Sequence, residues 1–150
     1  MPTRRRFVLL MCAALTACST VASLESRPLH AGVSRTFAAD FESVSAAVDV
    51  AMETLPVNII APVEVAGARV ARFDRPVTST GWGESGRVVI AQVDARTTRV
   101  TVAVDPRDPA QPVERTERGY ADEIFREVNV ALWTGRAGVA HVTPTDADTR

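Results

Sequence analysis

The sequence contains no lysine and few residues of the types that build metal or redox sites. All 17 basic residues among the 150 are Arg, and there are only two Cys and two His. The absence of Lys excludes a lysine nucleophile, a Schiff base and a P-loop lysine. Two Cys and two His are too few for a usual zinc cluster, so we expect no metal and no cofactor. The net charge of −1 provides no basic field, so we expect no nucleic-acid partner.

The first eighteen residues have the charge and hydropathy pattern of an export signal. Three Arg at positions 4–6 precede an apolar run at 7–16, and the segment ends in Leu15-Thr16-Ala17-Cys18. The apolar run is about half of the roughly 20 residues that a membrane-spanning helix needs. We therefore expect residues 1–17 to be a signal peptide rather than a permanent anchor.

The box Leu15-Thr16-Ala17-Cys18 resembles the lipobox of bacterial lipoproteins. The resemblance implies that the thiol of Cys18 receives a diacylglyceryl group, that the chain is cut before it, and that the new N-terminus is acylated. Ser19 in place of Asp implies, by the enteric-type sorting rule, the periplasmic side of the outer membrane, or the cell membrane in a host without an outer membrane. The alternative is an ordinary secretory signal cut near Ala17, which leaves Cys18 as a free thiol.

The mature chain is expected to hold one domain without a disulfide. Removal of the signal peptide takes Cys12 and three Arg away, which leaves 14 Arg against 18 acidic residues, a formal charge of −4. That charge opposes electrostatic attachment to anionic headgroups, so the expected anchor is the lipid. Residues 18–34 are expected to be the lipidated N-terminus and a tether, 35–134 a single domain, and 135–150 a polar tail.

Apolar periodicity and turn signals predict the order β-α-β-β-β-β-α for the domain. The expected helices are 41–55, capped by Asp40, and 117–133, stopped by Gly135. Pro62 marks an edge or a bulge in its strand. The expected strands are 35–40, 57–65, 68–73, 87–94 and 99–105, with loops at 75–86 and 106–116. Consecutive short strands favour an α+β two-layer sandwich, with an antiparallel sheet of four to five strands and two helices on one face.

The apolar residues that open the domain carry a second resemblance. They are Phe37, Phe41, Val44, Ala47, Val48, Ala51 and Leu55. Together with the element order, this spacing resembles small periplasmic lipoproteins of uncharacterised function. It is also similar to the helix-grip domains of lipoproteins in the outer-membrane assembly machinery. Neither resemblance implies a catalytic residue.

The side chains suited to catalysis do not form a motif. Ser85 lies in Gly-Glu-Ser-Gly, without the spacing of a nucleophile elbow. His30 and His141 lie in the expected tether and tail, where rigid positioning of a general base is not expected. Glu123 and Glu127 share one helix face, which is typical of a solvated charged surface. We therefore expect a non-enzymatic domain.

Apolar side chains on the outer face of the fourth strand indicate an interaction surface. Val88 and Ile90 are expected to face the helices, so the alternation of a strand turns their neighbours outward. These outward residues are Val89, Ala91 and Val93. An exposed apolar row is usually covered. The cover is either the chain itself, from 106–116 or the segment after Trp133, or a partner or second copy of the chain.

The sequence thus favours a membrane-tethered periplasmic lipoprotein whose domain binds a protein or another envelope component. Trp82, between two Gly in the loop 75–86, is a further candidate contact residue, or a lid over the end of the core. The alternatives are a carrier of a small ligand such as lipid or peptidoglycan, an uncharacterised enzyme, and a purely structural envelope protein.

Replacement of the expected lipidated residue tests the anchor. Cys18→Ser should abolish lipidation and leave the protein unprocessed or soluble, because the hydroxyl is not the thiol that the lipobox chemistry modifies. Metabolic labelling with a fatty-acid analogue measures this directly. Equal label in the wild type and the variant would contradict the prediction.

Overall fold

The computed structural model describes residues 19–77, 83–106 and 116–135. The elements in these ranges are α2 (Ser19–Ser26), β1 (Val33–Phe37), α3 (Phe41–Glu53), β2 (Asn58–Val65), β3 (Ala68–Arg75), β4 (Glu84–Asp94), β5 (Thr97–Pro106) and α4 (Glu117–Thr134). The five strands form one antiparallel sheet in the order β1-β5-β4-β3-β2. The predicted α+β architecture with an antiparallel sheet is therefore confirmed.

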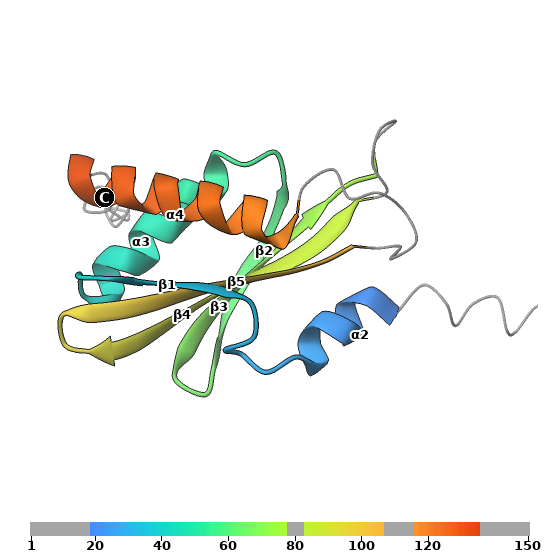
Figure 1. The fold of residues 1–150 in the computed structure, drawn as a ribbon, viewed down its shortest axis with the longest axis horizontal. Helices are drawn as coiled ribbons and strands as arrows, with labels where there is room; N and C mark the ends of the chain where they lie inside the picture. The colour runs from blue at the N-terminus through green and yellow to red at the C-terminus, as the bar shows by residue number, and fades with distance from the viewer. Residues whose placement is uncertain (1–18, 78–82, 107–115, 136–150) are drawn as a thin grey trace, which may run out of the picture.

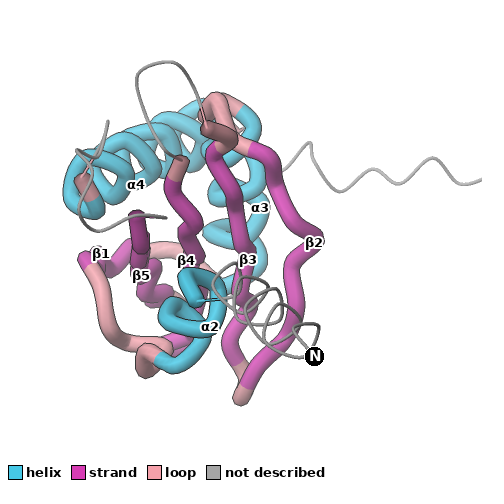
Figure 2. Tube along the Cα trace, turned by 90° about the vertical axis from the view of Figure 1, so that its right-hand side faces the viewer, coloured by secondary structure: helices cyan, strands magenta, loops and turns pink. Residues whose placement is uncertain are grey.

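Helices cover both faces of this sheet within the described residues. Helices α3 and α4 pack together on one face, as the two-layer prediction requires (Figure 1). Helix α2 lies on the other face, against β4 and β5 (Figure 2). This third helix is absent from the sequence-based prediction, and it covers part of the sheet face that the prediction left open.

The ends of the predicted helices follow from local capping. The carboxylate of Asp40 accepts a hydrogen bond from the backbone N–H of Ser43 at 2.9 Å, which satisfies a free donor at the start of α3. Hydrogen bonds from Ser43 lower the pKa of Asp40. Thr116 caps α4 in the same way, and Gly135 ends it in the left-handed conformation, with φ at 69°. The predicted cap at Asp40 and stop at Gly135 are both confirmed.

The main core lies between the sheet and helices α3 and α4. The predicted apolar stripes supply its buried side chains, among them Val44, Val48, Ile124, Phe125, Val88, Ile90 and Val102, each at 0–1% exposure. The rings of Phe37 and Phe125 meet edge to face, 6.1 Å apart between centroids. The ring of Phe73 lies over Gly86 on the neighbouring strand, where a Cβ atom would collide with it.

The edge strand β2 follows the expectation drawn from its proline. It pairs only with β3, and the pairing register shifts between Ile60 and Val63, on either side of Pro62. A proline in a strand interior removes a ladder donor, which an edge position or a bulge tolerates. The strand therefore has both of the features that its sequence indicates.

The prediction of an irregular tether is wrong for the described residues from 19 onward. Helix α2 occupies Ser19–Ser26, and its Leu24 is buried against the sheet at 4% exposure. This docking relies on hydrogen bonds to backbone carbonyls. Every residue has such a carbonyl, so the hydropathy of the sequence does not indicate the docking. Several predicted strand boundaries shift as well: β1 begins at Val33, β5 begins at Thr97, and β4 begins at Glu84, inside the expected loop.

Truncation of a core aromatic tests the assignment of the α4 face. Phe125→Ala should lower the free energy of unfolding by about 3–5 kcal/mol, because it removes a buried ring and leaves a cavity. Val130→Ala on the same helix is the control, since Val130 is 43% exposed and its loss should cost about 0.5 kcal/mol or less. Urea unfolding measures both, and equal losses would contradict the assignment.

Candidate functional site

A buried arginine holds the N-terminal segment, which runs from α2 to Leu29, on the face of the sheet opposite α3 and α4. Arg87 on β4 is 4% exposed, and its guanidinium donates to the backbone carbonyls of Leu24 at 2.7 Å, Arg27 at 2.9 Å and Pro28 at 2.6 Å. These carbonyls lie at and just after the end of α2, where a helix leaves its carbonyls unpaired. The cation also complements the negative end of the helix dipole. Arg87 thus caps α2 from the sheet.

Ion pairs surround this cap. Arg27 pairs with the buried carboxylate of Asp105, which also accepts a hydrogen bond from Ser23 at 2.9 Å. Glu25 on α2 pairs with Arg72 on β3 at 3.0 Å. Burial, and then the positive charge of Arg27, lower the pKa of Arg87, while Asp105 acts in the opposite direction. The segment is therefore fixed by several polar contacts from three strands.

The N-terminal segment also buries part of the predicted interaction surface. Val89 is only 4% exposed and clusters with Ala68 and Val70, with Leu29 and the half-buried Ala91 packed against them. The expectation that Val89 is an exposed contact residue is therefore wrong. A cover from the chain itself is present, and within the described residues it comes from Leu29 in the N-terminal segment.

Of the remaining predicted site residues, the structure describes only Ala91 and Val93. Val93 is 49% exposed, near the end of β4. Cys18 and Trp82 lie outside the described residues, and so does most of each predicted cover: residues 107–115 of the loop 106–116, and residues 136–150 of the segment after Trp133. Of the predicted surface residues that the structure describes, Ala91 is half-buried and Val93 is exposed.

A groove runs between α2 and the β2–β3 hairpin. Two adjoining cavities of about 260 and 390 Å³ share Leu24 and Arg72 as lining residues. We call them together the α2 groove; its further lining residues are Glu25, Leu29, Val65, Val70, Arg87, Asn58, Ile60, Phe73, Asp74, Ser85 and Gly86.

Exposed apolar side chains of the edge strand extend the α2 groove. Ile60, Val63 and Val65 are 48%, 40% and 39% exposed. They pair with Arg72, Val70 and Ala68, so they share the sheet face that α2 occupies. Sequence reasoning missed these residues. The apolar residues on both sides of Pro62, in a strand already marked as an edge, are the signal that identifies them.

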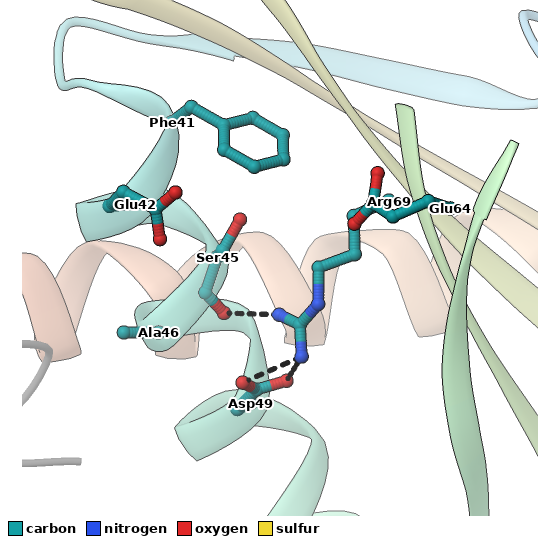
Figure 3. Close-up of a pocket in the computed structure, with 7 residues that line it drawn as sticks. All are labelled: Phe41, Glu42, Ser45, Ala46, Asp49, Glu64 and Arg69. Atoms are coloured by element: carbon teal, nitrogen blue, oxygen red, sulfur yellow. Dashed lines mark hydrogen bonds and ion pairs between the residues drawn. The ribbon is translucent and has the colours of Figure 1, made fainter. Parts of the chain in front are cut away.

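A third cavity, of about 320 Å³, lies between α3 and the same hairpin on the opposite face of the sheet. Figure 3 shows its lining: Phe41, Glu42, Ser45, Ala46, Asp49, Glu64 and Arg69. The Nη2 atom of Arg69 lies 3.0 Å from both carboxylate oxygens of Asp49, and its Nη1 atom donates to the backbone carbonyl of Ser45 at 3.3 Å. We call this cavity the α3 pocket.

A buried carboxylate lies at the end of the sheet where β4 begins. Glu84 is 2% exposed and accepts a hydrogen bond from the hydroxyl of Tyr120 at 3.1 Å, with Arg75 3.9 Å away. Burial raises the pKa of Tyr120, so its hydroxyl keeps the proton that it donates to Glu84. These contacts join α4 to the sheet.

The catalytic candidates remain separate in the described part of the chain. The hydroxyl of Ser85 donates to Asp74 at 3.1 Å, an arrangement that does not involve a histidine base. Glu123 and Glu127 flank Arg126 at 3.8 and 3.1 Å on the surface of α4. His30 is exposed, and His141 lies outside the described residues. Residues 19–77, 83–106 and 116–135 contain no group of three or more His, Cys, Asp or Glu side chains placed to hold a metal ion.

Comparisons with known proteins add little. No family model matches the chain, and no curated protein matches it. Among solved structures, the crystal structure of the Zhui aromatase/cyclase from Streptomyces sp. R1128 is 15% identical, with 79% of this chain and 96% of that chain covered and a TM-score of 0.27. A TM-score this low does not indicate a shared fold or function. None of the described helices is both long and apolar enough to cross a membrane.

Loss of the Arg87 guanidinium should release the N-terminal segment while the main core stays folded. Arg87→Met leaves three carbonyls without their donor, so we expect faster amide exchange at residues 23–31 and a loss of about 2–4 kcal/mol. Arg96→Met in the exposed β4–β5 turn is the control. Unchanged exchange at residues 23–31 in Arg87→Met would show that the segment does not depend on this clamp.

Charge substitutions distinguish the two ends of the predicted apolar row. Val89→Asp should lower the free energy of unfolding by about 3 kcal/mol or more, because it buries an unpaired carboxylate. Val93→Asp should change it by about 0.5 kcal/mol or less, since this side chain is exposed. Thermal and urea unfolding measure both variants. A tolerated Val89→Asp would mean that the N-terminal segment leaves this face open in solution.

Proposed function

We propose that this chain is an envelope lipoprotein, anchored through an acylated Cys18 on the periplasmic side of the outer membrane, whose domain binds a partner without catalysing a reaction. The lipobox resemblance supports the anchor. The engagement of Glu84, Tyr120 and Ser85 in contacts within the fold supports a binding role over a catalytic one. The partner is a protein or another envelope component.

One observation carries the proposal: helix α2 begins one residue after Cys18 and is docked on the sheet. The Cα of Cys18 lies about 3.8 Å from that of Ser19. Four residues of helix add roughly 6 Å to Ser23, which bonds to Asp105. The acylated residue is therefore within roughly 10 Å of a fixed point on the domain. An anchor this short holds the domain at the membrane surface.

The α2 groove supplies the binding surface in this proposal. It lies beside the helix that leads from the anchor, and the exposed Ile60, Val63 and Val65 extend its apolar lining. Exposed apolar residues that cluster in this way mark interaction sites. A partner that reaches this groove has to be present close to the membrane.

A carrier of a small ligand is the second candidate. The larger cavity of the α2 groove, about 390 Å³, is within the size range of small-molecule sites, and its lining includes the apolar residues Leu24 and Ile60. The main space between the sheet and helices α3 and α4 is filled by buried side chains, so the groove is the part of the fold that favours this alternative.

Cross-linking from the groove tests the proposal. A photoreactive residue at Ile60 or Val65 in the lipidated protein should form adducts in intact envelopes, and the same residue at Val130 on α4 should not. A protein-sized mass increase supports a protein partner, a doubled mass a second copy, and a small increase a bound ligand. Adducts that persist unchanged in Cys18→Ser, or equal yields at Val130, would contradict a site set by the anchor.

A further inference from the structure

The α3 pocket carries an unbalanced set of charges. Three carboxylates line it, from Glu42 and Asp49 on α3 and from Glu64 on β2, against one guanidinium, that of Arg69. Arg69 is already paired with Asp49, so these two charges offset one another. Glu42 and Glu64 form no ion pair within the described part of the chain. The pocket therefore presents a net negative charge that its own residues do not neutralise.

A buried hydroxyl in the same pocket also lacks a partner. Ser45 is 5% exposed, and its Oγ atom has no hydrogen-bond partner among the described residues. A serine within a helix commonly bonds back to a carbonyl of the preceding turn, which this one does not do. Figure 3 shows the hydroxyl pointing away from the Arg69–Asp49 pair, toward the side where Phe41 and Glu42 lie. A donor that enters the pocket beside this hydroxyl would satisfy it.

We propose that the α3 pocket binds a primary ammonium group, such as that of an amine or of a lysyl side chain on a partner. An ammonium has three N–H donors, which the carboxylates of Glu42 and Glu64 and the hydroxyl of Ser45 accept. The ring of Phe41 adds a face that attracts a cation. The chain has no lysine, so a lysyl ammonium in this pocket would come from another molecule.

The geometry favours an organic cation over a metal ion. No group of three or more acidic, His or Cys side chains among the described residues, those of the α3 pocket included, is placed to hold a metal. The cavity of about 320 Å³ is large for a single ion but is within the size range of small-molecule sites. This site lies on the opposite face of the sheet from the α2 groove and does not depend on the function proposed for that groove.

The test uses the full mature chain carrying Cys18→Ser, titrated with 1,5-diaminopentane and followed by the backbone amide signals in NMR. Because Glu42 and Glu64 are exposed, each ion pair contributes little, and we expect a dissociation constant on the order of 1 mM. Saturable shifts should appear at Ser45, Glu64 and Arg69, and they should weaken as salt is added. The neutral analogue 1-pentanol should give no such shifts.

Matched variants locate the site. Glu64→Gln and Ser45→Ala should each weaken binding by about fivefold or more. Glu53→Gln is the control and should not weaken binding, because Glu53 is an exposed residue of α3 outside the pocket. Neither pocket variant removes an interaction within the fold, so both should unfold as the parent does. Absence of saturable shifts, equal weakening by Glu53→Gln, or tighter saturation of the same signals by Ca²⁺ would each overturn the proposal.

Discussion

The buried guanidinium of Arg87 is the interaction on which the open face of the sheet depends. It donates to three carbonyls of the N-terminal segment, and so it joins residues about sixty positions apart in the sequence. Without a donor these carbonyls would be buried and unpaired, which costs free energy comparable to the lost hydrogen bonds. The position of α2, the burial of Val89 and the walls of the α2 groove depend on this hydrogen bonding together with the ion pairs of Arg27 and Glu25 beside it.

A buried cation on this face needs compensation, and its surroundings provide it. The carboxylate of Asp105 lies near Arg87 and pairs with Arg27, while the three carbonyls direct their dipoles at the guanidinium. The Nε atom of Arg87 has no partner within the described residues. The cost of taking this charge out of water offsets much of what its contacts contribute to net stability. Removing one partner would still leave the other buried and unpaired, so the contacts hold the segment in a defined position. In the proposed lipoprotein, that defined position sets where the domain sits relative to its anchor.

Helices and strands whose faces and ends are set by residues close by in the sequence were predictable. The stripe of α3, the cap at Asp40, the stop at Gly135 and the edge character of the strand with Pro62 all agree with the structure. The site was less predictable. Val89 was correctly assigned to the face away from α3 and α4, but the alternation of a strand does not indicate what covers that face. The cover comes from a segment whose own hydropathy has no period.

The sequence by itself determined the fold class, the helix boundaries near their caps and the side chains of the main core, because each of these follows from periodicity and from contacts within a few residues. The lipobox resemblance at Cys18 also lies in the sequence alone. Only the tertiary structure decided that residues 19–29 dock on the sheet, that the α2 groove forms beside them, and that Ser45 and Glu64 line one pocket. Those features depend on hydrogen bonds and packing between residues far apart along the chain, and neither leaves a local pattern in the sequence.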